Sequence, residues 1–325
     1  MKRKKPENIR LIAVDMDGTT LNDAKEISAA TQTVLAQSMD RGIRLVISTG
    51  RSWPGVRRYV ELIRPNAPVI TNNGAMIIDP ENGQIIKQCL LEPEDARAVY
   101  RLAKERNVSF VIWADNVLYC NRVDERTLDY GRRFGGMEPR PLGQKPSPLG
   151  QRPGTGSDLT AQERAADINP EPASESADEA TGTPAGPVTE SGDEEFEYLC
   201  ENGVTKLLWY DTPENAERWA EEIKDYPFKN VTINTSEGGF LEFFNCNVSK
   251  GRMLEYVADM LNISIAESVA VGDGENDIPM LRAAGYAAVP ENAGDKIKAY
   301  ADEIISSNND EGVARFLSQQ FAQNR

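Results

Sequence analysis

The pattern of apolar and polar positions near the start of the chain alternates between strand and helix periods. Three short apolar runs are typical of buried strands, and they lie at residues 9–14, 44–48 and 69–71. After the first run, Ser28 is a good helix N-cap, apolar residues follow at helical spacing, and Gly42 marks the end of that helix. A second helix is predicted over residues 54–63. This alternation predicts a parallel, doubly wound sheet.

The pattern changes after the third run. Apolar stretches at residues 75–79 and 84–90 flank the sequence Pro-Glu-Asn-Gly, which is typical of a hairpin. Mixed elements follow, with helices predicted at 93–106, 125–134 and 213–225 and strands at 108–113, 117–119, 205–210, 231–235 and 240–245. The doubly wound pattern then returns, with helices at 251–261, 277–284 and from 312, and strands at 268–271 and 286–289.

These patterns predict an α/β protein of two parts. Residues 1–79 and 248–325 would form a discontinuous core with a doubly wound, Rossmann-like parallel sheet. Residues 80–247 would form an inserted α+β domain. Within that insertion, residues 138–195 are rich in Pro, Gly, Ser, Ala and acids and poor in large apolar residues, so we expect them to be disordered.

Charge and composition narrow the possible functions. The net charge of the chain is −15. Residues 158–197 contain twelve acids and one arginine and so carry −11 of it, which means that the acidity belongs to one segment. Histidine is absent, which excludes histidine-based triads and metal sites. The four cysteines are widely spaced, which argues against zinc and favours free thiols in a reducing compartment. No apolar run approaches the roughly 20 residues of a membrane span. We therefore expect a cytoplasmic protein that binds neither membrane nor nucleic acid.

The most informative motif follows the first apolar run. Asp15 and Asp17 stand where a buried strand would end, followed by Gly18 and Thr19. The carboxyl ends of parallel strands form the ligand crevice of open α/β sheets. An Asp there can act as a nucleophile toward phosphorus, and a second Asp can serve as its acid/base partner. Taken alone, the motif is more often a surface turn.

Three further pieces occupy similar positions. Thr49-Gly50-Arg51 follows the second apolar run and could bind phosphate oxygens, although a simple helix cap would look the same. Lys250 opens a predicted helix, where a cation is unfavourable unless an anion compensates it. The acid cluster at residues 272–277 ends another apolar run and is suited to a hard cation such as Mg²⁺.

Competing motifs fail on spacing. An EF-hand loop requires glycine at its sixth position, but the two candidate loops have Thr20 and Ile278 there. The chain contains neither a P-loop sequence nor a dinucleotide-binding glycine motif after the first strand.

In their order along the chain, the four pieces resemble the haloacid dehalogenase (HAD) superfamily of phosphohydrolases. The large inserted domain is similar to the α/β cap of the Cof-type branch. The matching sequences are Asp-Met-Asp-Gly-Thr at 15–19, Thr-Gly-Arg at 49–51, Val-Ser-Lys-Gly at 248–251 and Gly-Asp-Gly-Glu-Asn-Asp at 272–277. The acidic segment has no counterpart in the family pattern.

This resemblance implies a role for each residue. Asp15 would be the nucleophile that forms an aspartyl-phosphate, and Asp17 would be the general acid/base. Asp15, Asp273 and the backbone carbonyl of Asp17 would hold Mg²⁺. Lys250 would bind the substrate phosphate together with Thr49, Asn276 and the backbone N–H groups of Met16 and Gly50. Asp277 would orient the other groups, and Arg51 would contact the substrate or the cap.

The implied activity is Mg²⁺-dependent hydrolysis of a small phosphorylated metabolite, such as a sugar phosphate or a phosphorylated cofactor. Two alternatives stay open. One is phosphotransfer to a hydroxyl, as in phosphomannomutases of the same superfamily. The other is a non-catalytic binding or regulatory module built on the same core. The sequence does not identify the physiological substrate or the oligomeric state.

Overall fold

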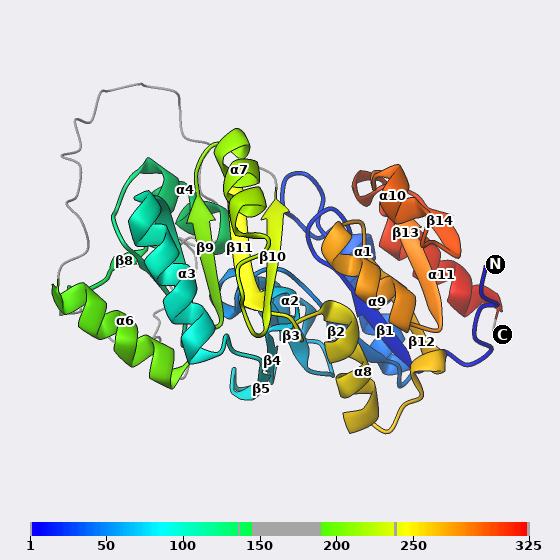
Figure 1. Cartoon of the computed structure of the whole chain (residues 1–325). Coiled ribbons are helices and arrows are strands. Elements are labelled where there is room, and N and C mark those ends of the chain that lie inside the picture. Colours follow the sequence, from blue (N-terminus) through cyan, green and yellow to red (C-terminus); the bar gives the residue numbers. More distant parts are fainter. Residues whose placement is uncertain (1, 136, 145–189, 237–238, 324–325) are drawn as a thin grey trace, which may run out of the picture.

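The computed structural model of the protein describes residues 2–135, 137–144, 190–236 and 239–323. Its core contains a five-stranded parallel sheet with the strand order β14-β13-β12-β1-β2 (Figure 1). The strands are β1 (Leu11–Val14), β2 (Arg44–Ile47), β12 (Ser268–Val271), β13 (Tyr286–Pro290) and β14 (Glu303–Ile305). The predicted doubly wound core is confirmed.

Helices cover both faces of this sheet. Ile12 and Val14 of β1 pack toward α1 (Ala29–Asp40), α2 (Trp53–Ile63) and α11 (Gly312–Gln323). Leu11 and Ala13 pack toward α8 (Lys250–Met260), α9 (Ile278–Ala283) and α10 (Asp295–Lys298). Burial on both faces explains why β1 is a continuous apolar run rather than an alternating one.

A small antiparallel sheet adjoins the core. It consists of β3 (Val69–Thr71), β4 (Met76–Ile78) and β5 (Ile85–Gln88). A parallel bridge between Ser48 and Ile70 links it to the chain that leaves β2. The domain boundary expected at residues 79 and 80 lies in the turn of the β4–β5 hairpin. Short 3₁₀ turns complete the core, namely η1 (Asn72–Gly74), η2 (Ile265–Glu267), η3 (Glu275–Asp277) and η4 (Asn308–Asp310).

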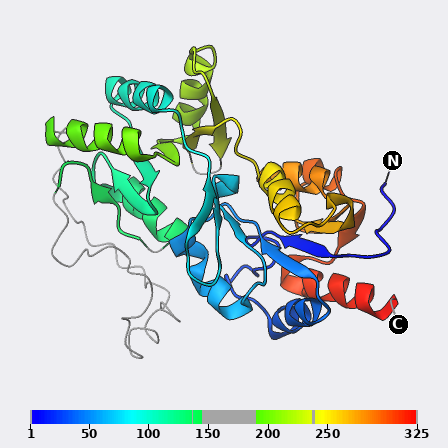
Figure 2. The same ribbon diagram turned by 90° about the horizontal axis from the view of Figure 1, so that it is seen from below.

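The inserted domain, called the cap below, is built on a six-stranded mixed sheet. Its strand order is β10-β11-β9-β6-β7-β8. The strands are β6 (Ser109–Ala114), β7 (Val117–Cys120), β8 (Arg140–Pro141), β9 (Lys206–Tyr210), β10 (Val231–Ser236) and β11 (Phe240–Asn245). One face packs against α3 (Pro93–Arg106), α6 (Glu190–Asn202) and α7 (Pro213–Ile223), and the other against α4 (Glu125–Gly135). Figure 2 shows the cap beside the core.

The acidic segment has narrower limits than the composition predicts. Residues 138–144 include β8, and residues 190–195 form the first turns of α6, so the expectation of disorder is wrong for both flanks. The reason is tertiary packing. Phe196, Leu199 and Cys200 of α6 are buried in the cap core, and Glu195 accepts a hydrogen bond from the backbone N–H of Gly143 at 2.7 Å. The rest of the predicted segment, residues 145–189, lies outside the described residues.

Candidate active site

Asp15 follows β1 at the carboxyl edge of the parallel sheet, as predicted. Its backbone N–H donates to the carbonyl of Val271 at the end of β12 (2.9 Å), and its own carbonyl accepts from the hydroxyl of Thr20 (2.5 Å). The residue is only 6% exposed. Gly18 has a φ of +73°, and a Cβ at this position would lie 2.3 Å from an oxygen of Asp273. The glycine therefore allows the loop after β1 to approach the loop after β12.

Lys250 is completely buried at the start of α8, between two carboxylates. Its Nζ lies 2.6 Å from Oδ1 of Asp15 and 2.6 Å from Oδ1 of Asp277. Burial alone would lower the lysine pKa, but the two negative charges raise it above its usual value. The ammonium is therefore charged. These carboxylates are the anions that the sequence required to compensate a cation at a helix N-terminus.

Asp273 and Asp277 complete a cluster of three acids around this lysine. Oδ2 of Asp277 accepts the backbone N–H groups of Asp273 (3.0 Å) and Gly274 (2.9 Å), which fixes the loop after β12. Oδ1 of Asp273 accepts from the Thr19 hydroxyl at 2.6 Å. Asp277 thus holds both the lysine and the loop that carries Asp273, and its orienting role in catalysis stays a prediction.

The electrostatics of this cluster favour an added cation. Burial, followed by the charge of Asp277, raises the pKa of Asp15 well above its usual value, although Lys250 opposes the shift. The pKa of Asp273 is raised to about 6, mainly by burial. Carboxylate oxygens of Asp15, Asp273 and Asp277 lie within 4.8 Å of one another. Three acids against one lysine leave excess negative charge, and their all-oxygen donor set fits Mg²⁺.

Asp17 has a different environment from Asp15. Its carboxylate accepts two hydrogen bonds from Arg51, from Nε at 2.6 Å and from the terminal nitrogen at 2.7 Å, and Lys25 Nζ lies at 3.0 Å. Burial would raise the Asp17 pKa, but these two cations lower it to about 2. Arg51 also stacks over Tyr59, with its guanidinium carbon 5.5 Å from the ring centre. In this arrangement Asp17 is ionised.

Three of the remaining predicted phosphate ligands, Thr49, Gly50 and Asn276, meet around Asn73. Its side-chain oxygen accepts from Asn276 Nδ2 at 2.8 Å, and a Cβ on Gly50 would come within 2.7 Å of the same oxygen. The backbone N–H of Asn73 donates to the carbonyl of Thr49, which is buried. Met16 is also buried, and its carbonyl accepts three N–H groups of the following loop.

Three residues outside the predicted set also make contacts in the site, namely Asn73, Lys25 and Thr19. Asn73 and its neighbour Asn72 have φ values of +59° and +50°, in the left-handed region that asparagine tolerates better than most residues. The Asn-Asn-Gly sequence after β3 therefore indicates a backbone in the left-handed region. No local feature of Lys25 indicates its pairing with Asp17.

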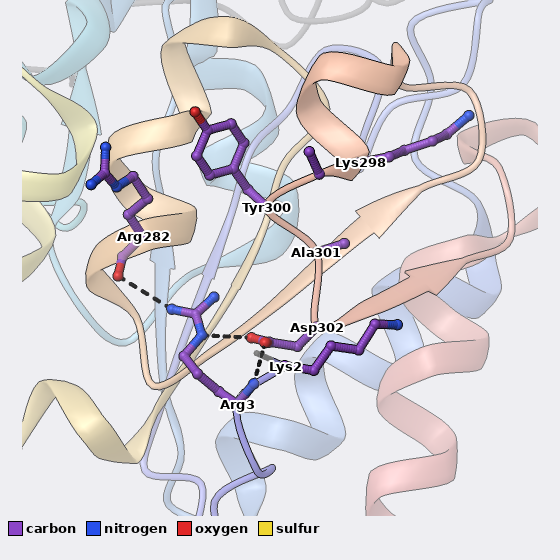
Figure 3. A pocket seen from close by; sticks show the side chains of 8 residues that line it. Lys2, Arg3, Arg282, Lys298, Tyr300, Ala301 and Asp302 are labelled. Carbon is purple, nitrogen blue, oxygen red and sulfur yellow. Dashed lines mark hydrogen bonds and ion pairs between the residues drawn. The ribbon is translucent and has the colours of Figure 1, made fainter.

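A cavity of about 420 Å³ lies away from the acid cluster. Its lining includes Asp302, which directly precedes β14, and Arg282, which lies near the start of β13. Figure 3 shows Arg3 reaching Asp302, with which it makes hydrogen bonds of 2.6 and 2.7 Å. Arg3 also donates to the carbonyls of Leu281, Arg282 and Ala284. The cavity thus lies at the amino ends of the strands, opposite the acid cluster, and the arginine there anchors the N-terminal segment.

The chain matches the family of haloacid dehalogenase-like hydrolases over residues 12–317, and it belongs to this family. Phosphatase YwpJ of Bacillus subtilis (strain 168) is 27% identical over 321 residues, which cover 95% of this chain and 99% of the relative. A second Bacillus subtilis relative, 5-amino-6-(5-phospho-D-ribitylamino)uracil phosphatase YwtE, is 26% identical over 311 residues, with coverage of 96% and 98%. The crystal structure of TM0651 from Thermotoga maritima aligns with a TM-score of 0.71 and 26% identity, over 96% of this chain and 97% of that chain.

These matches confirm three predictions from the sequence. The chain is a HAD-superfamily member of the Cof type, its fold is the α/β core with an additional cap, and its enzyme class is the HAD-type phosphoric monoester hydrolases. Among the residues that the structure describes, none of the helices has both the length and the apolar character needed to cross a bilayer.

Proposed function

We propose that this protein hydrolyses a small phosphate monoester with Mg²⁺, through an aspartyl-phosphate on Asp15. One observation carries the proposal. Asp15 is a nearly buried carboxylate at the carboxyl edge of the parallel sheet, with a buried ammonium 2.6 Å from its Oδ1. A carboxylate that attacks phosphorus must approach an anion, so it needs positive charge beside it.

Lys250 supplies part of that charge in a fixed position. Asp277 holds the ammonium from its other side and is itself fixed by two backbone N–H groups. The lysine therefore reaches Asp15 without reorganisation, which is how a preorganised site lowers the barrier to charge development. Its remaining N–H can bind an oxygen of the incoming phosphate.

Asp17 would protonate the leaving oxygen and then take a proton from the hydrolytic water. With a pKa of about 2 it carries no proton while Arg51 holds it. We infer that the Asp17–Arg51 pair opens before the leaving group is protonated. Opening would return the Asp17 pKa toward its ordinary range and free the guanidinium to bind phosphate or substrate.

The other phosphate oxygens would be bound at the carboxyl end of β2. Thr49, the backbone N–H groups of Gly50 and Met16, and the side chain of Asn276 would donate there. Asn73 holds Asn276 through its side chain and Thr49 through its backbone, and so positions both.

Asp15, Asp273 and the backbone carbonyl of Asp17 would hold Mg²⁺, which would neutralise charge between the nucleophile and the phosphate and align the two. Thr19 would keep Asp273 oriented through its 2.6 Å hydrogen bond. The metal would also complete the charge balance of the acid cluster.

For the substrate we propose a phosphorylated sugar or a phosphorylated cofactor or its precursor. The relative YwtE is named for 5-amino-6-(5-phospho-D-ribitylamino)uracil, which is a small phosphate monoester. We further place the activity in the cytoplasm, because the four cysteines are unpaired.

A phosphate-release screen over many monoesters tests the proposal. Wild-type protein with Mg²⁺ should release phosphate, and Asp15→Asn should not. Asp259→Asn, an exposed carboxylate on α8, is the matched control and should retain full activity. Phosphate transferred to an added hydroxyl acceptor instead of water would favour a phosphotransferase. Failure of the wild type to release phosphate from any monoester would contradict the proposal.

A further inference from the structure

The chain passes between core and cap through two short linkers. One leads from the end of β5 at Gln88 to the start of α3 at Pro93, and the other from the end of β11 at Asn245 to the start of α8 at Lys250. Both connections are visible in Figure 2. Any rigid-body motion of the cap relative to the core must be absorbed there.

A side-chain hydrogen bond joins the two linkers. Asn245 Nδ2 donates to the carbonyl of Leu90 at 2.8 Å. In addition, a small apolar cluster made of Ala75, Phe244 and Val248 packs the second linker against the core hairpin. The linkers therefore lie side by side where they cross.

Each linker carries a cysteine next to this hydrogen bond. Cys89 immediately precedes Leu90, and Cys246 immediately follows Asn245. Cys89 packs against the cluster that contains Phe244 and Val248, which stand two residues before and two residues after Cys246. Both thiols are free, Cys246 is exposed and Cys89 is half-buried.

We propose that Cys89 and Cys246 are a redox modification site, at which a peroxide forms a reversible disulfide that ties the two linkers together. The Cys246 thiolate attacks one oxygen of hydrogen peroxide, the O–O bond breaks, and Cys246 becomes a sulfenic acid with release of water. The Cys89 sulfur then attacks the Cys246 sulfur and a second water leaves. Two thiols and one peroxide thus give one disulfide and two waters, and a dithiol reductant reverses the change.

The environments of the two thiols set this order. Cys246 is exposed, so peroxide reaches it first. Cys89 is half-buried against the cluster beside Cys246, and burial, followed by repulsion from Cys246, raises its pKa, so it reacts second. The other two cysteines are buried in the cap, and burial raises the pKa of Cys120 and of Cys200 to about 12 each. They serve as internal controls that should not react.

The disulfide would act on the active site through the second linker. Lys250 lies four residues after Cys246, so the tie restrains both the cap and the segment that positions this lysine. A displacement of about 1 Å at the reacting groups costs on the order of a hundredfold in rate. The loss of turnover rests on the proposed function, whereas formation of the disulfide does not.

The test compares wild type with Cys89→Ser and Cys246→Ser after treatment with hydrogen peroxide. Digestion without reduction, followed by mass spectrometry, should show a Cys89–Cys246 cross-linked peptide that lacks two hydrogen atoms, in wild type alone. Oxidised wild type should also unfold at a higher temperature and lose kcat/KM, both reversed by dithiothreitol, while neither serine variant changes.

Two results would overturn the inference. One is oxidation of Cys246 with no peptide linking it to Cys89. The other is full formation of the cross-link with unchanged kcat/KM, which would remove the regulatory effect. If reduced wild type hydrolyses no monoester, the proposed function is contradicted instead. The mapped cross-link and the thermal shift then still test the disulfide, because neither measurement depends on activity.

Discussion

Replacement of Lys250 by methionine should destabilise the protein in a way that depends on pH. Methionine keeps most of the side-chain volume and removes the ammonium. Asp15 and Asp277 then face each other with no cation between them, at 6% and 0% exposure. Removal of one partner from a buried ion pair costs about 3–5 kcal/mol, because the remaining charge is left uncompensated. Since Lys250 has two such partners, we expect a loss in the upper part of that range.

The sign of the pH dependence follows from the Asp15 pKa. Burial and Asp277 already raise this pKa, and Lys250 is the main cause that lowers it. Without the lysine it rises further. An acid whose pKa is higher in the folded than in the unfolded state binds its proton first in the folded state, so folding stability increases as the pH falls through the folded pKa. The destabilisation should therefore shrink between about pH 8 and about pH 5.

Urea unfolding, followed by tryptophan fluorescence at both pH values, measures this effect. Lys206→Met is the matched control, because Lys206 is also buried but pairs with the single carboxylate of Glu242 at 2.9 Å. Added Mg²⁺ should lower the free energy of unfolding of neither variant. It should partly restore that of Lys250→Met and should have no such effect on Lys206→Met. A loss below about 1 kcal/mol at the higher pH, or an equal loss at both, would refute the reasoning.

Three more outcomes follow from the structure. Asp273→Asn should weaken Mg²⁺ binding in calorimetry and abolish activity, with Asp259→Asn unchanged, and activity that survives a chelator would argue against the metal site. Arg51→Gln should raise the Asp17 pKa from about 2 toward its ordinary value in an NMR titration. The stability that Asp17 gives above its unfolded pKa would then be smaller, and what is left would be lost at a higher pH as acid is added. A short Gly/Ser linker in place of residues 145–189 should leave kcat within a few-fold, because Gly143 and Glu195 pin the flanks together, and a large loss at unchanged thermal stability would assign that segment a catalytic role.

Elements with strong local patterns could be predicted closely from the sequence. The structure bears out α3 at Pro93–Arg106, whose start has a proline followed by Glu94 and Asp95 and whose last turn has Lys104 and Arg106. These residues suit the helix dipole at each end, so local chemistry alone defines the helix. The short but continuous apolar run of β1 was similarly informative, because a strand buried on both faces has no polar alternation.

Elements that depend on tertiary contacts were missed. The first turns of α6 are acidic and resemble the segment before them, and only the spacing of Phe196, Leu199 and Cys200 indicates a buried face. The strands β8 and β14 are two and three residues long, too short for any period to be visible. Each pairs in parallel with the strand that precedes it, β7 for β8 and β13 for β14, across an intervening helix. This pairing depends on how the crossover packs, which no local pattern encodes.

The candidate site shows the same division. Asp15, Lys250 and Asp273 could be identified because each stands at the end of a predicted strand or the start of a predicted helix, and parallel topology brings such positions to one edge. The ion pair of Asp17 with Arg51, and the contacts of Asn73, depend on side-chain positions across loops. Sequence spacing does not determine those positions.

The central claim is that Asp15 receives the phosphoryl group. Rapid-quench labelling with a ³²P-labelled monoester that the screen identifies, followed by peptide mapping, tests it most directly. We predict label on Asp15 within the first turnover, its disappearance as phosphate is released, and no label in Asp15→Asn. Label on any other residue, or turnover at the wild-type rate in Asp15→Asn, would contradict the account.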